Sequence, residues 1–382
     1  MANFIDYLEW RGDLTWEQAP FNEVDNLILS YFSYVNLDEV IDSPDVRMTT
    51  REASGKFFRL YSEEDLEKDK SLIRDAPYGM KAMADTPRFG DLEIRNYVNQ
   101  ISHERAMQFS AMEIVLDQKT SYIAFRGTDD RITGWKEDFL LSNGTVEAEK
   151  ASVRYLNRVA GLSDRKLLIG GHSKGGNLAV YAAVCCDPEV RERIVTIYDN
   201  DGPGFTAEFL EKPEIEAVRE RIVRIIPESS VVGLLLEHFT DPVIVKSSEK
   251  GVMQHDGLTW QVSRDRFLRS RELSRMAVGL AQVLHDWMDT MDREQKNDFI
   301  EDVFAVLEAP GVKTLTELQN GGWKSIRAML KRVEKLKPEN RKVTEELLKD
   351  LAGHLADYIL HPDKAEEETK RWSEYGRDAK NP

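Results

Sequence analysis

Short apolar runs separated by polar residues recur through the first 265 positions of the chain and predict strands. Residues 107–116 and 121–126 are mostly apolar, and the polar residues 117–120 between them predict a hairpin turn. Residues 21–35 and 146–160 instead carry apolar side chains at three- and four-residue spacing, which predicts helices. We therefore expect strands at 95–101, 107–116, 121–126, 166–169, 193–198, 221–226, 242–247 and 259–262, and helices at 21–35, 63–74, 146–160, 176–184, 206–219 and 231–238.

The alternation of strands and helices predicts an α/β fold whose central sheet is mostly parallel and carries helices on both faces. From residue 267 onward only helical periodicity is left, and the charged residues after Pro362 predict a frayed tail. This pattern predicts a first domain at 1–265 and a C-terminal helical region at 266–382. The helices expected in that region are 273–291, 292–307, 314–336 and 338–360.

Ser173 lies at the apex of the most informative segment, Gly171-His-Ser-Lys-Gly175, which has a strand-like run before it and a helix-like run after it. Strand, sharp turn and helix with a central serine form the nucleophile elbow of α/β-hydrolases. The turn brings backbone segments close together, so glycine at 171 and 175 has a steric reason. We therefore expect Ser173 to be a nucleophile.

The composition narrows the class of protein and its partners. Charged residues make up 31% and hydrophobic residues 41% of the chain, as in ordinary soluble proteins. The net charge of −16 argues against nucleic acid or an anionic membrane as the main partner. No apolar run is long enough to span a membrane, and the first residues lack a basic segment followed by an apolar stretch, so a secretory signal is not expected. Adjacent Cys185 and Cys186 are expected to be reduced, so a cytoplasmic protein is favoured.

A serine nucleophile needs a base, and in α/β-hydrolases that histidine follows the serine in sequence. His255 lies on a loop between expected strands, whereas His238 ends an expected apolar helix. His255 is favoured because catalytic groups concentrate on loops held by a rigid scaffold. His172 adjoins the serine, and we expect it to be structural or to line the pocket.

The acid that orients the base is open between two carboxylates. Asp201 follows the strand at 193–198 and begins a Gly-Pro-Gly turn, and Glu228 follows the strand at 221–226. The tight turn slightly favours Asp201. Donors to an oxyanion are expected from the N–H group of Lys174 and from Gly127 and Thr128, which follow an earlier strand. No metal-ligand spacing, phosphate-binding loop or dinucleotide motif is present, so no cofactor is expected.

Residues 122–128, 135–138 and 171–176 resemble the class 3 lipase branch of the α/β-hydrolases. The segments 6–13, 21–25, 201–205 and 254–256, together with Trp260, resemble more closely the Mbeg1-like proteins, a bacterial family of unknown function, over about residues 1–265. The resemblance implies a lipase-like hydrolase fold, a serine nucleophile at Ser173 and a base at His255. Two departures stand out. Lys174 replaces the leucine of many class 3 lipases, and the expected late aspartate falls at Ser229 or Ser230, so Asp201 and Glu228 both stay open.

The sequence therefore predicts a serine hydrolase that cleaves a small-molecule ester, either a lipid or another acyl ester, through an acyl-enzyme on Ser173. The alternative is a catalytically weak hydrolase fold that serves as a binding or scaffold protein through its C-terminal helices. The open position of the acid is what motivates this alternative.

Overall fold

The computed structural model of the chain describes residues 2–67, 75–102, 107–128, 146–275, 277–279, 293–312, 317–318, 321–336, 341 and 344. Residues 135–138, the charged tail and most of the helices expected at 273–291 and 338–360 lie outside this set.

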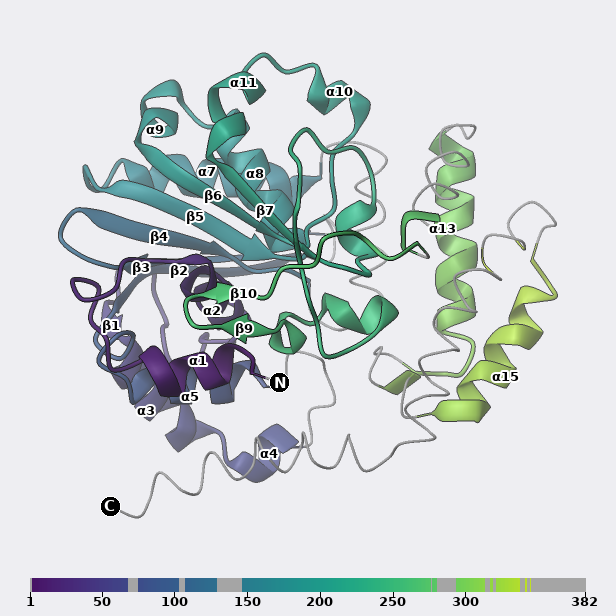
Figure 1. Cartoon of the computed structure of the whole chain (residues 1–382), viewed down its shortest axis with the longest axis horizontal. Coiled ribbons are helices and arrows are strands. Elements are labelled where there is room, and N and C mark those ends of the chain that lie inside the picture. The colour runs from purple at the N-terminus through teal and green to yellow at the C-terminus, as the bar shows by residue number, and fades with distance from the viewer. Residues whose placement is uncertain are drawn as a thin grey trace.

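An eight-stranded sheet forms the centre of the molecule, and its strands follow one another in chain order (Figure 1). The strands are β1 (Met48–Thr49), β2 (Glu93–Ser102), β3 (Met107–Val115), β4 (Thr120–Phe125), β5 (Lys166–His172), β6 (Ile194–Asn200), β7 (Ile222–Pro227) and β8 (Val243–Val245). Pairing is antiparallel from β1 to β4 and parallel from β4 to β8. The predicted α/β class, the mostly parallel sheet and the hairpin at 117–120 are thus confirmed.

The helices that connect the parallel strands lie on one face of the sheet. Right-handed crossovers between strands in sequential order place every connecting helix on the same side. The side chains of Ile123, Phe125 and Ile169 point to that face and share a core with α7 and α8. The elements of this layer are α7 (Glu147–Ala160), α8 (Lys174–Cys185), α9 (Pro188–Arg193), α10 (Ala207–Leu210), α11 (Ile215–Val218) and the 3₁₀ turn η2 (Arg219–Arg221). The single helix expected at 206–219 is wrong, because the chain turns at Pro213 between α10 and α11.

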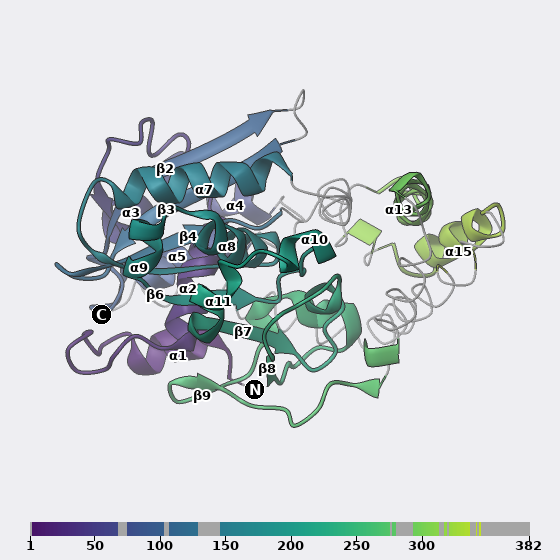
Figure 2. The same cartoon turned by 90° about the horizontal axis from the view of Figure 1, so that it is seen from above.

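The N-terminal helices cover the opposite face and lie below the sheet in Figure 1, so that α7 and α8 are nearer the viewer in the view from above (Figure 2). They are α1 (Phe4–Arg11), α2 (Glu23–Phe32), α3 (Thr50–Leu60), α4 (Glu63–Glu67) and α5 (Ala76–Ala84). Capping boxes at Asn3, Asn22 and Thr49 start three of them. Asp25 in the first turn of α2 forms a fully buried ion pair with Arg88 at 2.6 Å, which ties this layer to the segment before β2.

The chain after β7 departs from the sequence prediction. The helix expected at 231–238 is wrong: only a 3₁₀ turn, η3 (Val232–Leu234), forms, and Leu236 has φ of 63°, which no right-handed helix accepts. The expected strand at 259–262 reduces to a bridge between Trp260 and Ser247. Two 3₁₀ turns, η4 (Gly251–His255) and η5 (Gly257–Thr259), precede the short pair β9 (Val262–Ser263) and β10 (Arg266–Phe267).

Two C-terminal helices, α13 (Arg293–Leu307) and α15 (Gly322–Val333), lie beside the carboxyl edge of the sheet and have a small core of their own (Figure 1). They fall within the helices expected at 292–307 and 314–336. Phe267, by contrast, is buried in the core under the N-terminal helices. Among the described helices, none is long and apolar enough to cross a bilayer.

Candidate active site

Ser173 lies in the sharp turn between β5 and α8. Its backbone has φ of 58° and ψ of −134°, a conformation that L-residues rarely adopt. A Cβ on Gly171 would lie 2.3 Å from the carbonyl carbon of Gly175, and a Cβ on Gly175 would lie 2.2 Å from the Phe125 oxygen. The two glycines therefore allow the close backbone approach that the turn requires.

Asp201 occupies the equivalent position on the neighbouring strand. His172 at the end of β5 is in register with Asn200 at the end of β6, so Ser173 and Asp201 each follow directly. Asp201 also has a positive φ, of 54°. The Ser173 N–H donates to the Asn200 oxygen at 2.9 Å, and the Asp201 N–H donates to the Ile225 oxygen at 2.8 Å. Both side chains consequently start from the same carboxyl edge of the sheet.

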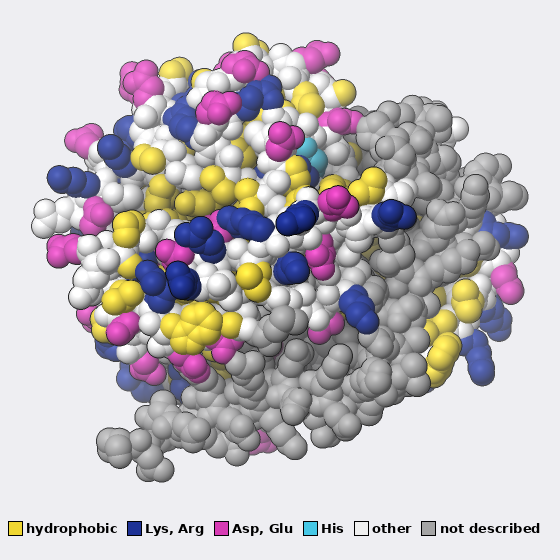
Figure 3. All heavy atoms as spheres, in the orientation of Figure 1, with side chains coloured by type: hydrophobic (Ala, Val, Ile, Leu, Met, Phe, Trp, Pro, Cys, Tyr) yellow, Lys and Arg dark blue, Asp and Glu magenta, His cyan; other side chains and the backbone are white. Residues whose placement is uncertain are grey.

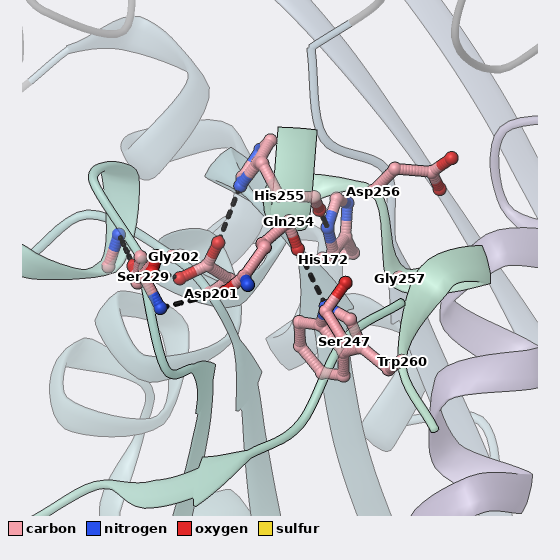
Figure 4. Close-up of polar contacts among 12 residues, drawn as sticks. His172, Asp201, Gly202, Ser229, Ser247, Gln254, His255, Asp256, Gly257 and Trp260 are labelled. Atoms are coloured by element: carbon pink, nitrogen blue, oxygen red, sulfur yellow. Dashed lines mark hydrogen bonds and ion pairs between the residues drawn. The ribbon is translucent and has the colours of Figure 1, made fainter. Parts of the chain in front are cut away.

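The Asp201 carboxylate is fully buried and holds His255 (Figure 4). Its Oδ2 accepts a hydrogen bond from His255 Nδ1 at 2.7 Å, and its Oδ1 accepts one from Ser230 Oγ at 2.5 Å. A carboxylate can only accept, so Nδ1 carries a proton, and in the neutral form of the ring Nε2 is the basic nitrogen. This is the tautomer that a general base of a serine nucleophile requires.

The other two candidates have different hydrogen bonds and surroundings. The Glu228 N–H donates to the Val245 oxygen at 3.0 Å, and its carbonyl accepts from the Ser274 N–H at 2.6 Å. Burial, and then the charge of Arg224, lower the pKa of His238 well below its usual 6.5. It is the Asp201 carboxylate that accepts from the His255 ring.

His172 connects the elbow to the loop that carries His255. Its ring lies 4.7 Å from the His255 ring, and its Nε2 donates to the His255 carbonyl oxygen at 2.7 Å. Its Nδ1 is then an acceptor for the Tyr34 hydroxyl, 3.0 Å away. Burial lowers the pKa of His172 well below 6.5, which keeps the ring neutral. His172 is thus a structural support of the His255 loop, in line with its expected role.

Further contacts fix the loop on both sides of His255. Gln254 Oε1 accepts from the Ser229 N–H at 2.7 Å, and its carbonyl oxygen accepts from Trp260 Nε1 at 2.8 Å. Asp256 Oδ1 accepts from the Tyr31 hydroxyl of α2 at 2.8 Å. Burial raises the pKa of Asp256 to about 7. The loop is consequently anchored to β7, to itself and to the N-terminal layer.

The expected oxyanion donors converge on the elbow. Lys174 is the first residue of α8, where backbone N–H groups have no partner within the helix. Gly127 lies against the elbow strand, because a Cβ there would be 2.4 Å from the His172 oxygen and 2.2 Å from the Tyr34 hydroxyl. Thr128 is buried next to it. Glu149 is close enough to Lys174 for that charge to oppose the effect of burial, which raises the Glu149 pKa to about 7.

Sequence reasoning missed the supporting residues Ser230, Tyr34 and Gln254. Ser230 had one signal, since it stands where the class 3 lipase pattern expects an aspartate. Its hydroxyl instead donates to Asp201, and it also accepts from the Gly233 N–H at 2.9 Å. No motif marks Tyr34, and Gln254 is marked only as part of the segment 254–256 that resembles the Mbeg1-like proteins. Among the described residues no group of His, Cys, Asp and Glu suits a metal ion.

Comparison with known proteins gives one family and one solved structure. The family model described as Mbeg1-like matches residues 83–305, more than half of the chain. No curated protein matches. A solved structure described as M37 lipase is 18% identical, with a TM-score of 0.31, and the match covers 46% of this chain and 70% of that one. A similarity of that size says little about either fold or function.

Proposed function

The chain belongs to the Mbeg1-like family, and from that premise, together with the geometry at Ser173, we propose that it is a serine hydrolase of the α/β-hydrolase fold that cleaves an acyl ester. The observation that carries the proposal is the hydrogen bond between Asp201 and His255 beside the elbow. A buried carboxylate that holds the proton on Nδ1 leaves Nε2 as the base for a strained serine beside it.

In the proposed mechanism, His255 Nε2 takes the proton of Ser173 Oγ as that oxygen attacks the ester carbonyl. Asp201 keeps the ring oriented and stabilises the imidazolium that forms. The oxyanion is stabilised by the Lys174 N–H at the N-terminus of α8 and by Thr128. The imidazolium then protonates the leaving alcohol, and a water activated by His255 releases the acid from Ser173.

The contact of Asp201 favours the hydrolase over the scaffold alternative. That alternative rested on an open acid position, and the Asp201 carboxylate is hydrogen-bonded to His255 although it follows β6 and not β7. Ser230, which follows β7, adds a hydrogen bond to the same carboxylate. We therefore assign Ser173, His255 and Asp201 to the triad, and Gly127, Thr128 and Lys174 to the oxyanion site.

Hydrolysis of a series of p-nitrophenyl esters with increasing acyl length tests the proposal. Ser173→Ala and His255→Asn should each lower kcat/KM by at least ~10³-fold, because each removes a member of the triad. Ser229→Ala and His238→Asn are the matched controls and should retain turnover. Thermal unfolding of every variant checks the fold. Turnover that survives Ser173→Ala would refute the proposal.

A further inference from the structure

Helix α15 has one face that is buried and one that is exposed. Ser325, Ile326, Met329 and Val333 turn inward, where the apolar ones join the small C-terminal core. At 3.6 residues per turn the opposite side of the helix presents Trp323 and Leu330 along one edge. These are exposed by 63% and 51%, and are among the most exposed large apolar side chains of the described chain.

Three exposed cations, Lys324, Arg327 and Lys331, occupy the rest of this exposed face. Exposed Glu334 and Lys335 follow directly after the last residue of the helix. Figure 3 shows basic side chains beside hydrophobic ones at the edge of the molecule where α15 lies. Helix α13, which packs beside α15, carries exposed Glu294, Asp298 and Glu301 instead. The basic face is therefore local, in a chain whose net charge is −16.

The combination of cations with exposed apolar side chains on one helix face favours an anionic bilayer over nucleic acid as the partner. A cationic helix face attracts an anionic surface, and an exposed tryptophan and leucine on the same face gain by entering the headgroup region of a bilayer. Nucleic acid would satisfy the charges alone, because its phosphates offer nothing to Leu330. The whole-chain charge had argued against an anionic membrane, but what such a surface requires is a concentrated basic patch, and α15 supplies one.

We propose that the exposed face of α15, comprising Trp323, Lys324, Arg327, Leu330 and Lys331, docks the protein on bilayers that contain anionic lipid, with Lys335 just after the helix adding a further positive charge. The helix lies parallel to the bilayer plane, with Trp323 and Leu330 in the interface and the cations at the lipid phosphates and carboxylates. The proposal goes beyond the hydrolase activity and does not depend on Ser173.

Cosedimentation of the full chain with vesicles tests it. The protein carries Ser173→Ala, so that lipid turnover cannot alter the vesicles, and the vesicles are phosphatidylcholine with or without 30 mol% phosphatidylserine. We expect binding to the phosphatidylserine vesicles at least ~10-fold tighter than to phosphatidylcholine alone, and a loss of that excess when salt rises from about 0.1 to about 0.5 M.

Two variants and two matched controls locate the surface. K324E/R327E/K331E and W323A/L330A should each weaken binding at least ~10-fold. R59E/K119E/K166E makes the same change of net charge at exposed sites elsewhere, and L60A/L162A removes leucines exposed by 52% and 65%. Both controls should bind like the parent. Circular dichroism and thermal unfolding verify the fold of each variant.

Three results would overturn the proposal. The first is no binding to phosphatidylserine vesicles, and the second is binding that both α15 variants retain. The third is equal affinity for a 20-base-pair DNA duplex without sensitivity to W323A/L330A, which would assign the face to polyanions in general. Loss of ester turnover by Ser173→Ala is measured separately, so failure of the docking proposal and failure of the hydrolase proposal are distinguishable.

Discussion

Ser173 and Asp201 both have a positive φ, which is costly for residues with a side chain. A positive φ outside glycine costs about 1–3 kcal/mol and persists only where the surrounding structure imposes it. Here two such residues, with φ of 58° and 54°, directly follow adjacent strands at the same register. The strain is explained if the serine and the carboxylate must both rise from the sheet edge toward one imidazole.

The identity of the acid can be tested by amide substitution. Asp201→Asn preserves size but presents an amide that no longer stabilises the imidazolium, so kcat/KM for a p-nitrophenyl ester should fall about 10³- to 10⁴-fold. Glu228→Gln should stay within about twofold of the parent, because the carboxylate that bonds the His255 ring is that of Asp201. Equal losses in the two variants, or none in Asp201→Asn, would mean that Asp201 is not the acid.

Asp256 predicts a pH dependence of stability. Its pKa is raised from 3.8 to about 7 in the folded protein, so the native state binds a proton more tightly than the unfolded chain does. Its contribution to stability is therefore complete below about pH 4 and is lost as the pH rises through 7.

Asp256→Asn cannot ionise, so its free energy of unfolding relative to the parent should rise by at least ~1 kcal/mol between pH 5 and pH 8. His172 titrates alike in both proteins and cancels in the difference. Urea unfolding of both proteins at the two pH values measures this difference in the free energy of unfolding. A difference that is independent of pH would contradict the raised pKa of Asp256.

At the scale of elements, the elbow depends on close backbone packing. Gly175→Ala would place a Cβ 2.2 Å from the Phe125 oxygen and 3.0 Å from the Gly127 nitrogen. We expect a loss of about 1–3 kcal/mol in the free energy of unfolding and a fall in turnover, since β4 and the expected oxyanion loop must shift.

Gly55→Ala in α3 is the matched control, because nothing lies within 4 Å of a Cβ at that position. It should stabilise the protein by about 0.5–1 kcal/mol, as alanine does in a helix, and leave turnover unchanged. Urea unfolding and ester hydrolysis measure both variants. A Gly175→Ala protein as stable and active as the parent would show that the turn tolerates a side chain.

The elements that could be predicted from sequence are those whose local pattern agrees with their tertiary setting. Strands β2 to β7 and helices α2, α7 and α8 follow directly from apolar periodicity. The helix expected at 231–238 failed because tertiary pairing prevails there: Glu237 forms a bridge with Phe205, and Leu236 adopts a positive φ next to it. Apolar residues at helical spacing cannot reveal such a pairing.

The candidate site was predictable up to one choice. Ser173 and His255 are marked by a motif and by a family resemblance, but Asp201 and Glu228 both follow strands, and sequence order does not separate them. The structure distinguishes them, because His255 Nδ1 donates to one carboxylate oxygen of Asp201 while the Ser230 hydroxyl donates to the other.

In the described part of the whole molecule, one hydrophobic core lies on each face of the sheet, and a third, smaller core lies in the C-terminal helices. Residues beyond 265 still contact the sheet, because the Ser270 N–H donates to the Ile244 oxygen at 2.9 Å and Phe267 is buried. We therefore propose that the hydrolase unit extends past the boundary expected from sequence.

Truncation tests this boundary. A chain of residues 1–279 should unfold cooperatively and retain ester turnover, while losing vesicle binding together with α15. A chain of residues 1–265 lacks β10 and Phe267 and should have a clearly lower Tm. Loss of turnover in the longer truncation, with its fold intact, would place the C-terminal helices in the active site and contradict the division.

Covalent labelling by a fluorophosphonate measures directly whether Ser173 is an activated nucleophile. We expect the folded protein to react at one site, which peptide mass spectrometry identifies as Ser173, and we expect His255→Asn and Asp201→Asn to slow the reaction by orders of magnitude. Ser173→Ala should not be labelled. Absence of labelling in the folded parent, or labelling at another serine, would mean that Ser173 is not the nucleophile.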